Sequence, residues 1–102
     1  MKKPGLSLKL FPVAEEDLEN IIDYISEDSI AGAEKILSKI ENTINKLLEF
    51  PLMGKSFKEV KLPYKGYRYV IADDYLIFYK IESNSINIYR IIHGARDYRA
   101  LL

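Results

Sequence analysis

The sequence predicts a single α+β domain, residues 1–102, in which a helical hairpin packs on one face of a mainly antiparallel four-stranded sheet. Three observations predict this fold class. Two consecutive segments carry apolar residues at helical spacing, and only a very short connection separates them. Three later segments have the β-branched and aromatic composition of strands, with short polar turns between them. A chain of 102 residues is also long enough to bury one core without metal or disulfide cross-links.

The first half of the chain predicts a strand followed by the two helices. Residues 6–10 alternate apolar and polar side chains, as a half-buried strand does, and Pro12 ends this strand. Apolar residues then recur on one helical face over residues 14–27, with acidic residues in the first turn. Ser29 is a suitable N-cap for the second helix, whose apolar stripe continues until Pro51. Because the connection allows only a tight turn, the two helices are expected to be antiparallel.

The second half predicts an irregular loop and a three-stranded meander. Residues 52–66 contain proline and glycine without a regular apolar period, which indicates a loop. Strands are expected at residues 67–72, 75–81 and 85–93, with Asp-Asp and Ser-Asn pairs as the turns between them. The last of these strands has the composition of a central strand. The only histidine, His93, ends it, before a glycine and a short basic tail.

The net charge of zero hides an uneven distribution of charged residues. Residues 13–50 carry ten acidic side chains against three lysines, whereas residues 51–102 carry nine basic side chains against five acidic ones. This asymmetry indicates either an acidic or polyanionic partner for the basic half or ordinary solvated faces. The chain has no cysteine, and one histidine argues against a structural zinc site. We expect a cytoplasmic protein with no metal, no cofactor and no membrane segment.

Four features of the sequence, in this order and spacing, carry a family resemblance. They are the order of the expected elements, the turn at residues 50–54, the tyrosine-framed hairpin Tyr67–Tyr79 and the Ile-Ile-His-Gly-Ala-Arg-Asp ending at residues 91–97. Together they resemble the RelE/ParE superfamily of toxins from bacterial type II toxin-antitoxin modules, over almost the whole chain. The resemblance implies the RelE/ParE-like β-α-α-β-β-β order. It also implies a growth-inhibiting toxin of a plasmid stabilisation system, silenced in a hetero-oligomer by an antitoxin that wraps over its surface.

Two mechanisms divide that superfamily. A RelE-like toxin is a ribosome-dependent, metal-free mRNA endoribonuclease, which needs cations for the developing phosphorane charge and side chains that move protons. A ParE-like toxin binds DNA gyrase and performs no chemistry. In the RelE-like case, the resemblance implies the catalytic candidates Arg68, His93, Arg96 and Tyr98.

Two positions favour the ParE-like branch. Leu76 stands where RelE-like ribonucleases tend to have an arginine, and Val70 stands where a second lysine is often found. The absence of such cations can lower the rate of cleavage by orders of magnitude. We therefore expect a toxin that binds gyrase rather than an enzyme, with mRNA cleavage on the ribosome as the alternative. The candidate target-binding residues are Lys65, Arg68, Arg96, Tyr98 and Arg99.

Several of these side chains have structural interpretations beside the functional ones. His93 is either an acid or base near neutral pH or a hydrogen-bonding residue that fixes the bend into the tail. By strict alternation Arg90 shares a face with Ile88 and Ile92, which favours a paired structural arginine over a ligand contact. Tyrosines on neighbouring strands stack on bases or pack across strands, and packing is favoured for Tyr67, Tyr69, Tyr75, Tyr79 and Tyr89.

Overall fold

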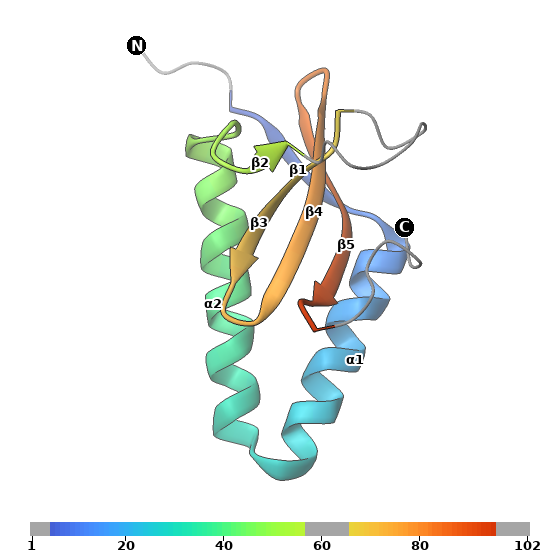
Figure 1. Ribbon diagram of the computed structural model, residues 1–102, viewed down its shortest axis with the longest axis vertical. Helices are drawn as coiled ribbons and strands as arrows, with labels where there is room; N and C mark the ends of the chain where they lie inside the picture. The colour runs from blue at the N-terminus through green and yellow to red at the C-terminus, as the bar shows by residue number, and fades with distance from the viewer. Residues whose placement is uncertain (1–4, 57–65, 96–102) are drawn as a thin grey trace.

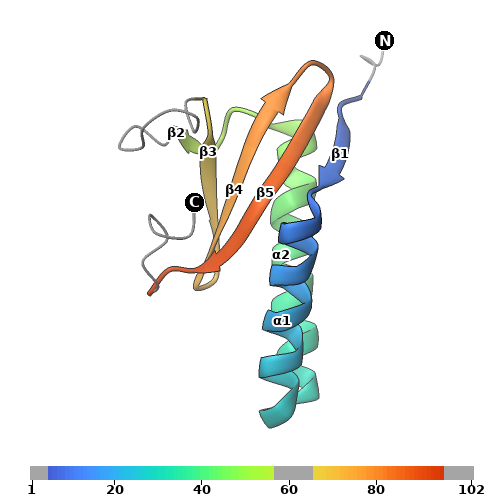
Figure 2. The ribbon, with the colours of Figure 1, turned by 90° about the vertical axis from the view of Figure 1, so that its right-hand side faces the viewer.

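A helical hairpin and one mixed β-sheet form two layers in the computed structural model, which describes residues 5–56 and 66–95 (Figure 1). In chain order the elements are β1 (Ser7–Leu10), α1 (Pro12–Asp28), α2 (Ile30–Glu49), β2 (Lys55–Ser56), β3 (Arg68–Ala72), β4 (Tyr75–Glu82) and β5 (Ser85–His93). Both helices lie on the same face of the sheet (Figure 2). The predicted α+β fold class is confirmed.

A single residue, Ser29, separates the two helices. Its hydroxyl oxygen accepts a hydrogen bond from the backbone N–H of Gly32 at 2.9 Å and caps α2, as predicted. α1 begins at Pro12. Proline suits the first position of a helix, because the N–H that it lacks would have no intrahelical partner in the first turn. α2 ends at Glu49, directly before the residue that precedes Pro51. Among the described residues, no helix has both the length and the apolar composition to cross a membrane.

The strands of the described residues form one sheet in the order β1-β5-β4-β3-β2. β5 pairs with β1 in parallel and with β4 in antiparallel orientation, and the β4–β3 and β3–β2 pairs are also antiparallel. β5 therefore lies inside the sheet along Ser85–Ile88, as its composition predicts. The sheet has five strands where the sequence predicts four, because the two-residue β2 lies in the segment expected to be irregular. A strand of two residues is too short to show the apolar–polar alternation by which strands are predicted from a sequence.

Apolar side chains pack on both faces of the sheet. The larger cluster lies between the sheet and the helices and includes the fully buried Ile40 and Leu47 of α2 and Tyr79 of β4. The smaller cluster lies on the opposite face and centres on Phe78 and Ile92. Successive residues of β4 thus pack on opposite faces, as the period of two of a strand requires. The sheet therefore has an inner face beneath the helices and an outer face.

Candidate functional site

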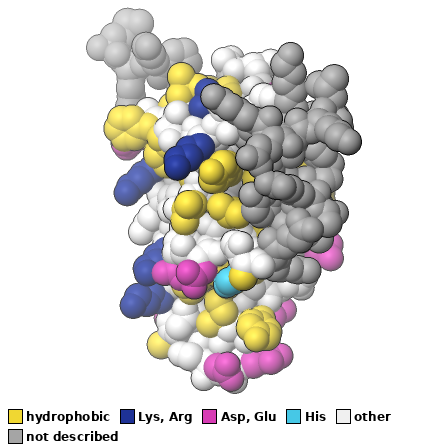
Figure 3. Space-filling view, viewed as in Figure 1, with side chains coloured by type: hydrophobic (Ala, Val, Ile, Leu, Met, Phe, Trp, Pro, Cys, Tyr) yellow, Lys and Arg dark blue, Asp and Glu magenta, His cyan; other side chains and the backbone are white. Residues whose placement is uncertain are grey.

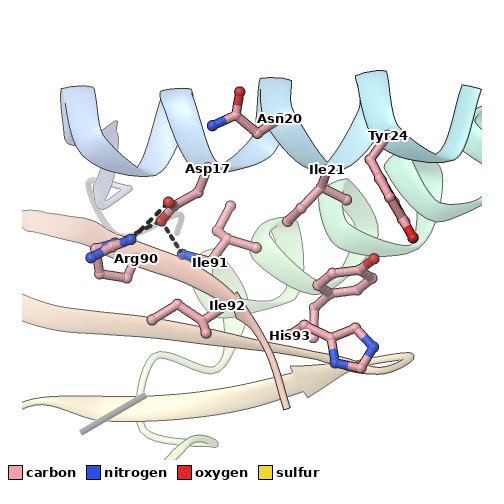
Figure 4. A pocket seen from close by; sticks show the side chains of 9 residues that line it. Asp17, Asn20, Ile21, Tyr24, Arg90, Ile91, Ile92 and His93 are labelled. Atoms are coloured by element: carbon pink, nitrogen blue, oxygen red, sulfur yellow. Dashed lines mark hydrogen bonds and ion pairs between the residues drawn. The ribbon is translucent and has the colours of Figure 1, made fainter. Parts of the chain in front are cut away.

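A pocket between α1 and the end of β5 gathers carboxylate, guanidinium, imidazole, amide and phenol groups. It encloses about 370 Å³, and Figure 4 shows side chains from α1 and from β5 that approach one another across it. Its lining residues are Asp17, Asn20, Ile21, Tyr24, Tyr75, Arg90, Ile91, Ile92 and His93. We call it the α1–β5 pocket.

Asp17 and Arg90 form the most extensive polar contact of this pocket. The two carboxylate oxygens of Asp17 accept hydrogen bonds from Arg90 Nε at 2.8 Å and Arg90 Nη2 at 2.9 Å, and one of them also accepts the backbone N–H of Ile91 at 3.0 Å. Asp17 and Arg90 are only 14% and 16% exposed. The hydrogen bonds to Asp17 raise the pKa of Arg90 above its ordinary value. The pair therefore fastens α1 to a part of β5 that β1 does not cover.

A β-bulge in β5 changes which face Arg90 lies on. The pairing of β4 with β5 shifts register, so that one extra residue, Tyr89, stands between two paired positions of β5. Ile88 therefore packs on the inner face and Ile92 on the outer face. The prediction that Arg90 shares one face with both isoleucines was wrong because strict alternation fails at the bulge. The interpretation of Arg90 as a paired structural arginine is confirmed by its contacts with Asp17.

His93 closes the end of the pocket. Its Nδ1 accepts a hydrogen bond from the backbone N–H of Ala95 at 3.0 Å, so the neutral ring carries its proton on Nε2. The imidazole packs edge to face against the ring of Tyr75, with 5.2 Å between the ring centroids. The next residue, Gly94, donates its N–H to the carbonyl of Asp74 at 2.8 Å. His93 thus makes the backbone contact expected of a residue that fixes the bend, and its catalytic role stays a prediction.

The polar groups of the pocket suit hydrogen-bonded recognition better than the binding of a phosphate. Among its described lining residues, Arg90 is the only permanently cationic side chain, and it is held by Asp17. Burial raises the pKa of Tyr75 above its ordinary value, so its phenol stays neutral at physiological pH. In the described part of the chain, no group of three or more histidine, aspartate or glutamate side chains could hold a metal ion.

A second polar centre fixes the turn between α2 and β2. The buried hydroxyl of Tyr79 donates to the carbonyl of Pro51 at 2.7 Å and accepts the N–H of Gly54 at 3.0 Å. Arg68 Nη1 donates to the carbonyl of Gly54 at 2.9 Å. A Cβ atom at Gly54 would lie 2.5 Å from the Tyr79 hydroxyl and 2.8 Å from the carbonyl oxygen of Tyr69, so only glycine fits there. We call these contacts the Tyr79 lock.

The structure does not bring the candidate residues Arg68 and His93 together. On β4, Arg68 is paired with Tyr79, whereas His93 is paired with Tyr75. Tyr75 and Tyr79 are four residues apart on β4, which corresponds to roughly 13 Å along the strand. The remaining candidates, Lys65, Arg96, Tyr98 and Arg99, lie outside the described residues.

The two positions that favour the ParE-like branch lie on opposite faces of the sheet. Leu76 packs against the outer-face cluster of Phe78 and Ile92, where an arginine would add a cation to that face. Val70 is only 8% exposed and packs beneath the helices. A lysine at Val70 would thus be buried in the core and would contribute to no cationic outer surface. Leu76 and Val70 therefore do not belong to one surface, and the choice between the two branches stays a prediction.

The strand tyrosines pack against other rings or within the core, as predicted. The rings of Tyr67 and Tyr89 lie 5.4 Å apart, and those of Tyr69 and Phe78 lie 6.0 Å apart. Tyr79 is fully buried. These contacts agree with the interpretation of the tyrosines as packing residues.

Reasoning from the sequence missed two of these polar groups. Asp17 follows Ala14 by three residues and precedes Ile21 by four, so it lies on the apolar stripe of α1. An acid within an apolar stripe was the signal that Arg90 had a partner there. No comparable signal marked Tyr79, because a tyrosine on a strand is an ordinary packing residue.

Comparison with known proteins relates this chain to bacterial toxins. Residues 8–98 match the family model described as the ParE toxin of the type II toxin-antitoxin system, parDE. The search of curated proteins found no significant match to the sequence. Among solved structures, the chromosomal ParDE system of P. aeruginosa is similar, with a TM-score of 0.70, 23% identity, and coverage of 86% of this chain and 95% of that one.

Two further solved structures have the same fold. The RelBE2 toxin-antitoxin complex of Mycobacterium tuberculosis gives a TM-score of 0.59 at 19% identity and covers 88% of this chain and 99% of its own. YafQ from E. coli gives a TM-score of 0.59 at 16% identity, with 88% and 94% covered. At these identities the likeness is one of fold, and it includes relatives named for both the ParE and the RelE groups.

Proposed function

The chain belongs to the family of ParE toxins of type II toxin-antitoxin systems, and on this basis we propose that it arrests growth by binding DNA gyrase in the cytoplasm. It performs no chemistry of its own in this proposal. A cognate antitoxin binds it and silences it in a hetero-oligomeric complex. Solved relatives that are themselves toxin-antitoxin complexes support this partner.

The separation of Arg68 from His93 is the observation that carries the choice of a binding protein. Cleavage of RNA without a metal needs an acid, a base and cations within hydrogen-bonding reach of a single phosphate. The β4 residues with which Arg68 and His93 pair are roughly 13 Å apart along the strand, and each of the two side chains bonds a backbone group of its own surroundings. The outer-face position where a RelE-like arginine is expected holds Leu76.

We assign recognition of gyrase above all to Arg96, with Tyr98, Arg99, Arg68 and Lys65 as further contacts. Removal of a buried, hydrogen-bonded charge from an interface commonly costs about 2 to 5 kcal/mol of binding. Surface substitutions usually change the free energy of unfolding by less than about 0.5 kcal/mol. Arg96→Ala is therefore expected to abolish growth arrest without lowering the melting temperature.

The experiment compares the two mechanisms side by side. The purified chain is added to a gyrase supercoiling assay and, separately, to a translating extract in which mRNA integrity is followed. We expect the parent protein to reduce supercoiling and to leave mRNA intact. The Arg96→Ala variant should no longer inhibit gyrase, so that supercoiling proceeds as without toxin. The Lys9→Ala variant, which removes a basic residue elsewhere, serves as the control and should inhibit as fully as the parent. Codon-dependent cleavage of mRNA with unchanged supercoiling would overturn the proposal in favour of a RelE-like ribonuclease.

A further inference from the structure

The α1–β5 pocket has the size and the aromatic walls of a small-molecule site. Its volume of about 370 Å³ falls within the usual range for such sites, about 300 to 1,000 Å³. Tyr75 and His93 meet there edge to face, at an interplanar angle of 86°, so their rings form two nearly perpendicular walls. Tyr24 lines the pocket from the helix layer, and Figure 4 shows its ring reaching from α1 toward the strand end where His93 lies. Three aromatic rings from two layers of the fold thus border one space.

Two phenol groups of this pocket are open to a ligand. Tyr24 is 73% exposed at the rim, and its ring packs against no other ring among the described residues. Tyr75 is only 9% exposed, yet its hydroxyl has no hydrogen-bond partner in the part of the chain that the structure describes. A ligand that covers these two rings therefore displaces water without breaking an internal contact of the protein.

Negative charge dominates around the pocket. α1, which forms one of its sides, carries seven acidic side chains and no lysine or arginine. Among the described lining residues, Asp17 and Arg90 carry the permanent charges, and as an ion pair they are neutral together. In Figure 3 an acidic group lies directly beside the histidine, with hydrophobic side chains below both. The field at the pocket thus favours a cationic ligand over an anionic one.

Asp74 supplies a negative charge close to the aromatic walls. It directly precedes Tyr75, and its carboxylate forms no ion pair with any described residue, whereas that of Asp73 is held by Lys39 at 2.9 Å. Burial raises the pKa of Tyr75, and the charges of Asp74 and Asp73 raise this pKa further, so the phenol lies in their negative potential. Asp74 is not itself a lining residue. Its charge therefore attracts a cation in the pocket without a direct contact.

The stronger hydrogen-bond acceptors of the pocket are already in use. The carboxylate oxygens of Asp17 hold Arg90 and the N–H of Ile91, and Nδ1 of His93 holds the N–H of Ala95. A primary ammonium or guanidinium group would bring several N–H donors that need acceptors in place of their water. A quaternary ammonium group has no N–H, and the faces of aromatic rings attract it. The pocket therefore suits a cation that is held by rings.

From the aromatic walls, the negative charge and the occupied acceptors, we propose that the α1–β5 pocket binds a small quaternary ammonium compound that also carries a hydroxyl or carbonyl oxygen, such as choline. The cationic group lies against the rings of Tyr24 and Tyr75, and the charge of Asp74 adds to the attraction. The oxygen of the ligand bonds the amide of Asn20 or the hydroxyl of Tyr75. The site shares no residue with those assigned to gyrase recognition, so this inference does not depend on the proposed function.

Calorimetric titration of the purified chain with choline tests the proposal. The matched control ligand is the alcohol in which a tert-butyl group replaces the trimethylammonium group, because it keeps the shape and the hydroxyl but has no charge. At equal ionic strength, choline is expected to bind at least about tenfold more tightly than this alcohol. Nuclear Overhauser effects from the N-methyl protons of choline should reach the ring protons of Tyr24 and Tyr75, which locates the ligand.

Four variants separate the contributions of the ring, the hydroxyl and the charge. Tyr24→Leu removes the ring and should weaken choline binding at least about fivefold, whereas Tyr24→Phe keeps the ring and should bind within about twofold of the parent. Asp74→Asn removes the nearby charge and should weaken binding about threefold at low salt and less at high salt. Glu41→Gln removes an exposed charge outside the pocket and is the control. All three positions are exposed, so thermal unfolding should resemble that of the parent.

Equal binding of choline and the uncharged alcohol, or a dissociation constant for choline weaker than about 10 mM, would overturn the inference. The same holds if Tyr24→Leu binds choline like the parent, or if the N-methyl protons contact tyrosine rings other than those of Tyr24 and Tyr75. None of these results bears on gyrase recognition, which the supercoiling assay with Arg96→Ala tests separately.

Discussion

The change Asp17→Asn tests how much stability the contact between α1 and β5 contributes. The carboxylate of Asp17 accepts three hydrogen bonds, two from Arg90 and one from the Ile91 N–H, at 2.8, 2.9 and 3.0 Å. Asparagine keeps the shape of the side chain but removes its charge. Its amide nitrogen also replaces one acceptor by a donor, which then faces a donor of Arg90 or Ile91.

The expected loss follows from these contacts. Removal of one partner from a buried ion pair costs about 3 to 5 kcal/mol, because the other charge stays buried alone. The remaining exposure of Asp17 and Arg90, 14% and 16%, and the carbonyl oxygen that asparagine retains both reduce this cost. We expect a loss of about 2 to 3 kcal/mol in the free energy of unfolding. For a domain of this size that lowers the melting temperature by roughly 10 to 20 °C.

Urea unfolding of a double-mutant cycle measures this contribution. Arg90→Leu and the combined Asp17→Asn/Arg90→Leu variant complete the cycle, and Glu19→Gln removes an exposed charge from the same helix as the control. The combined variant is expected to lose at least about 1 kcal/mol less than the sum of the single variants, because no charge is then left buried alone. A loss below about 1 kcal/mol for Asp17→Asn, or strictly additive losses, would refute the stabilising role of the pair.

Three further predictions concern the turn lock, the buried phenols and the helix cap. Tyr79→Phe removes the hydroxyl that bonds the turn at residues 51–54 and leaves a buried donor and a buried acceptor unpaired. Urea unfolding should therefore show a loss of about 1 to 3 kcal/mol in the free energy of unfolding. The control Tyr24→Phe, at an exposed tyrosine, should lose less than about 0.5 kcal/mol. Burial raises the pKa of Tyr75 and Tyr79 above the ordinary value of 10.0, so the unfolded chain loses these protons first. Stability should therefore be complete below pH 10 and fall as the pH rises above it, with a shallower fall in Tyr79→Phe, as urea titrations at stepped pH would show. Ser29→Ala removes the cap of α2 and should cost about 1 kcal/mol, and an unchanged urea midpoint would contradict this.

The helical hairpin and the meander were predictable because local patterns decide them. The apolar stripes of two helices and the cap at Ser29 are contained in consecutive residues, and so are the turns of the meander. The β1–β5 pairing was a different problem, since Ser7 lies beside Ser85 and no local signal relates them. The same holds for β2, whose two residues form a strand only because β3 lies next to them.

The candidate site was harder to predict because its parts depend on long-range placement. The bulge at Tyr89 reverses the alternation that the composition of β5 implies, and nothing in the residues themselves marks it. The aromatic walls of the α1–β5 pocket were likewise hidden, because Tyr24 belongs to α1 whereas Tyr75 and His93 belong to β4 and β5. Only the packing of the helix layer on the sheet brings the three rings to one space.

The position of β5 inside the sheet has a consequence for synthesis of the chain on the ribosome. β5 is the last strand among the described elements, yet β1 and β4 both pair with it, and Arg90 meets Asp17 from 73 positions away. The helical hairpin therefore emerges with its apolar stripe uncovered, and the sheet that covers it is complete only after β5 has been translated. Such long-range pairing slows folding. A nascent chain that stops before Ser85 lacks both the strand that joins β1 to β4 and the α1–β5 pocket, so a translation product of that length cannot complete the sheet.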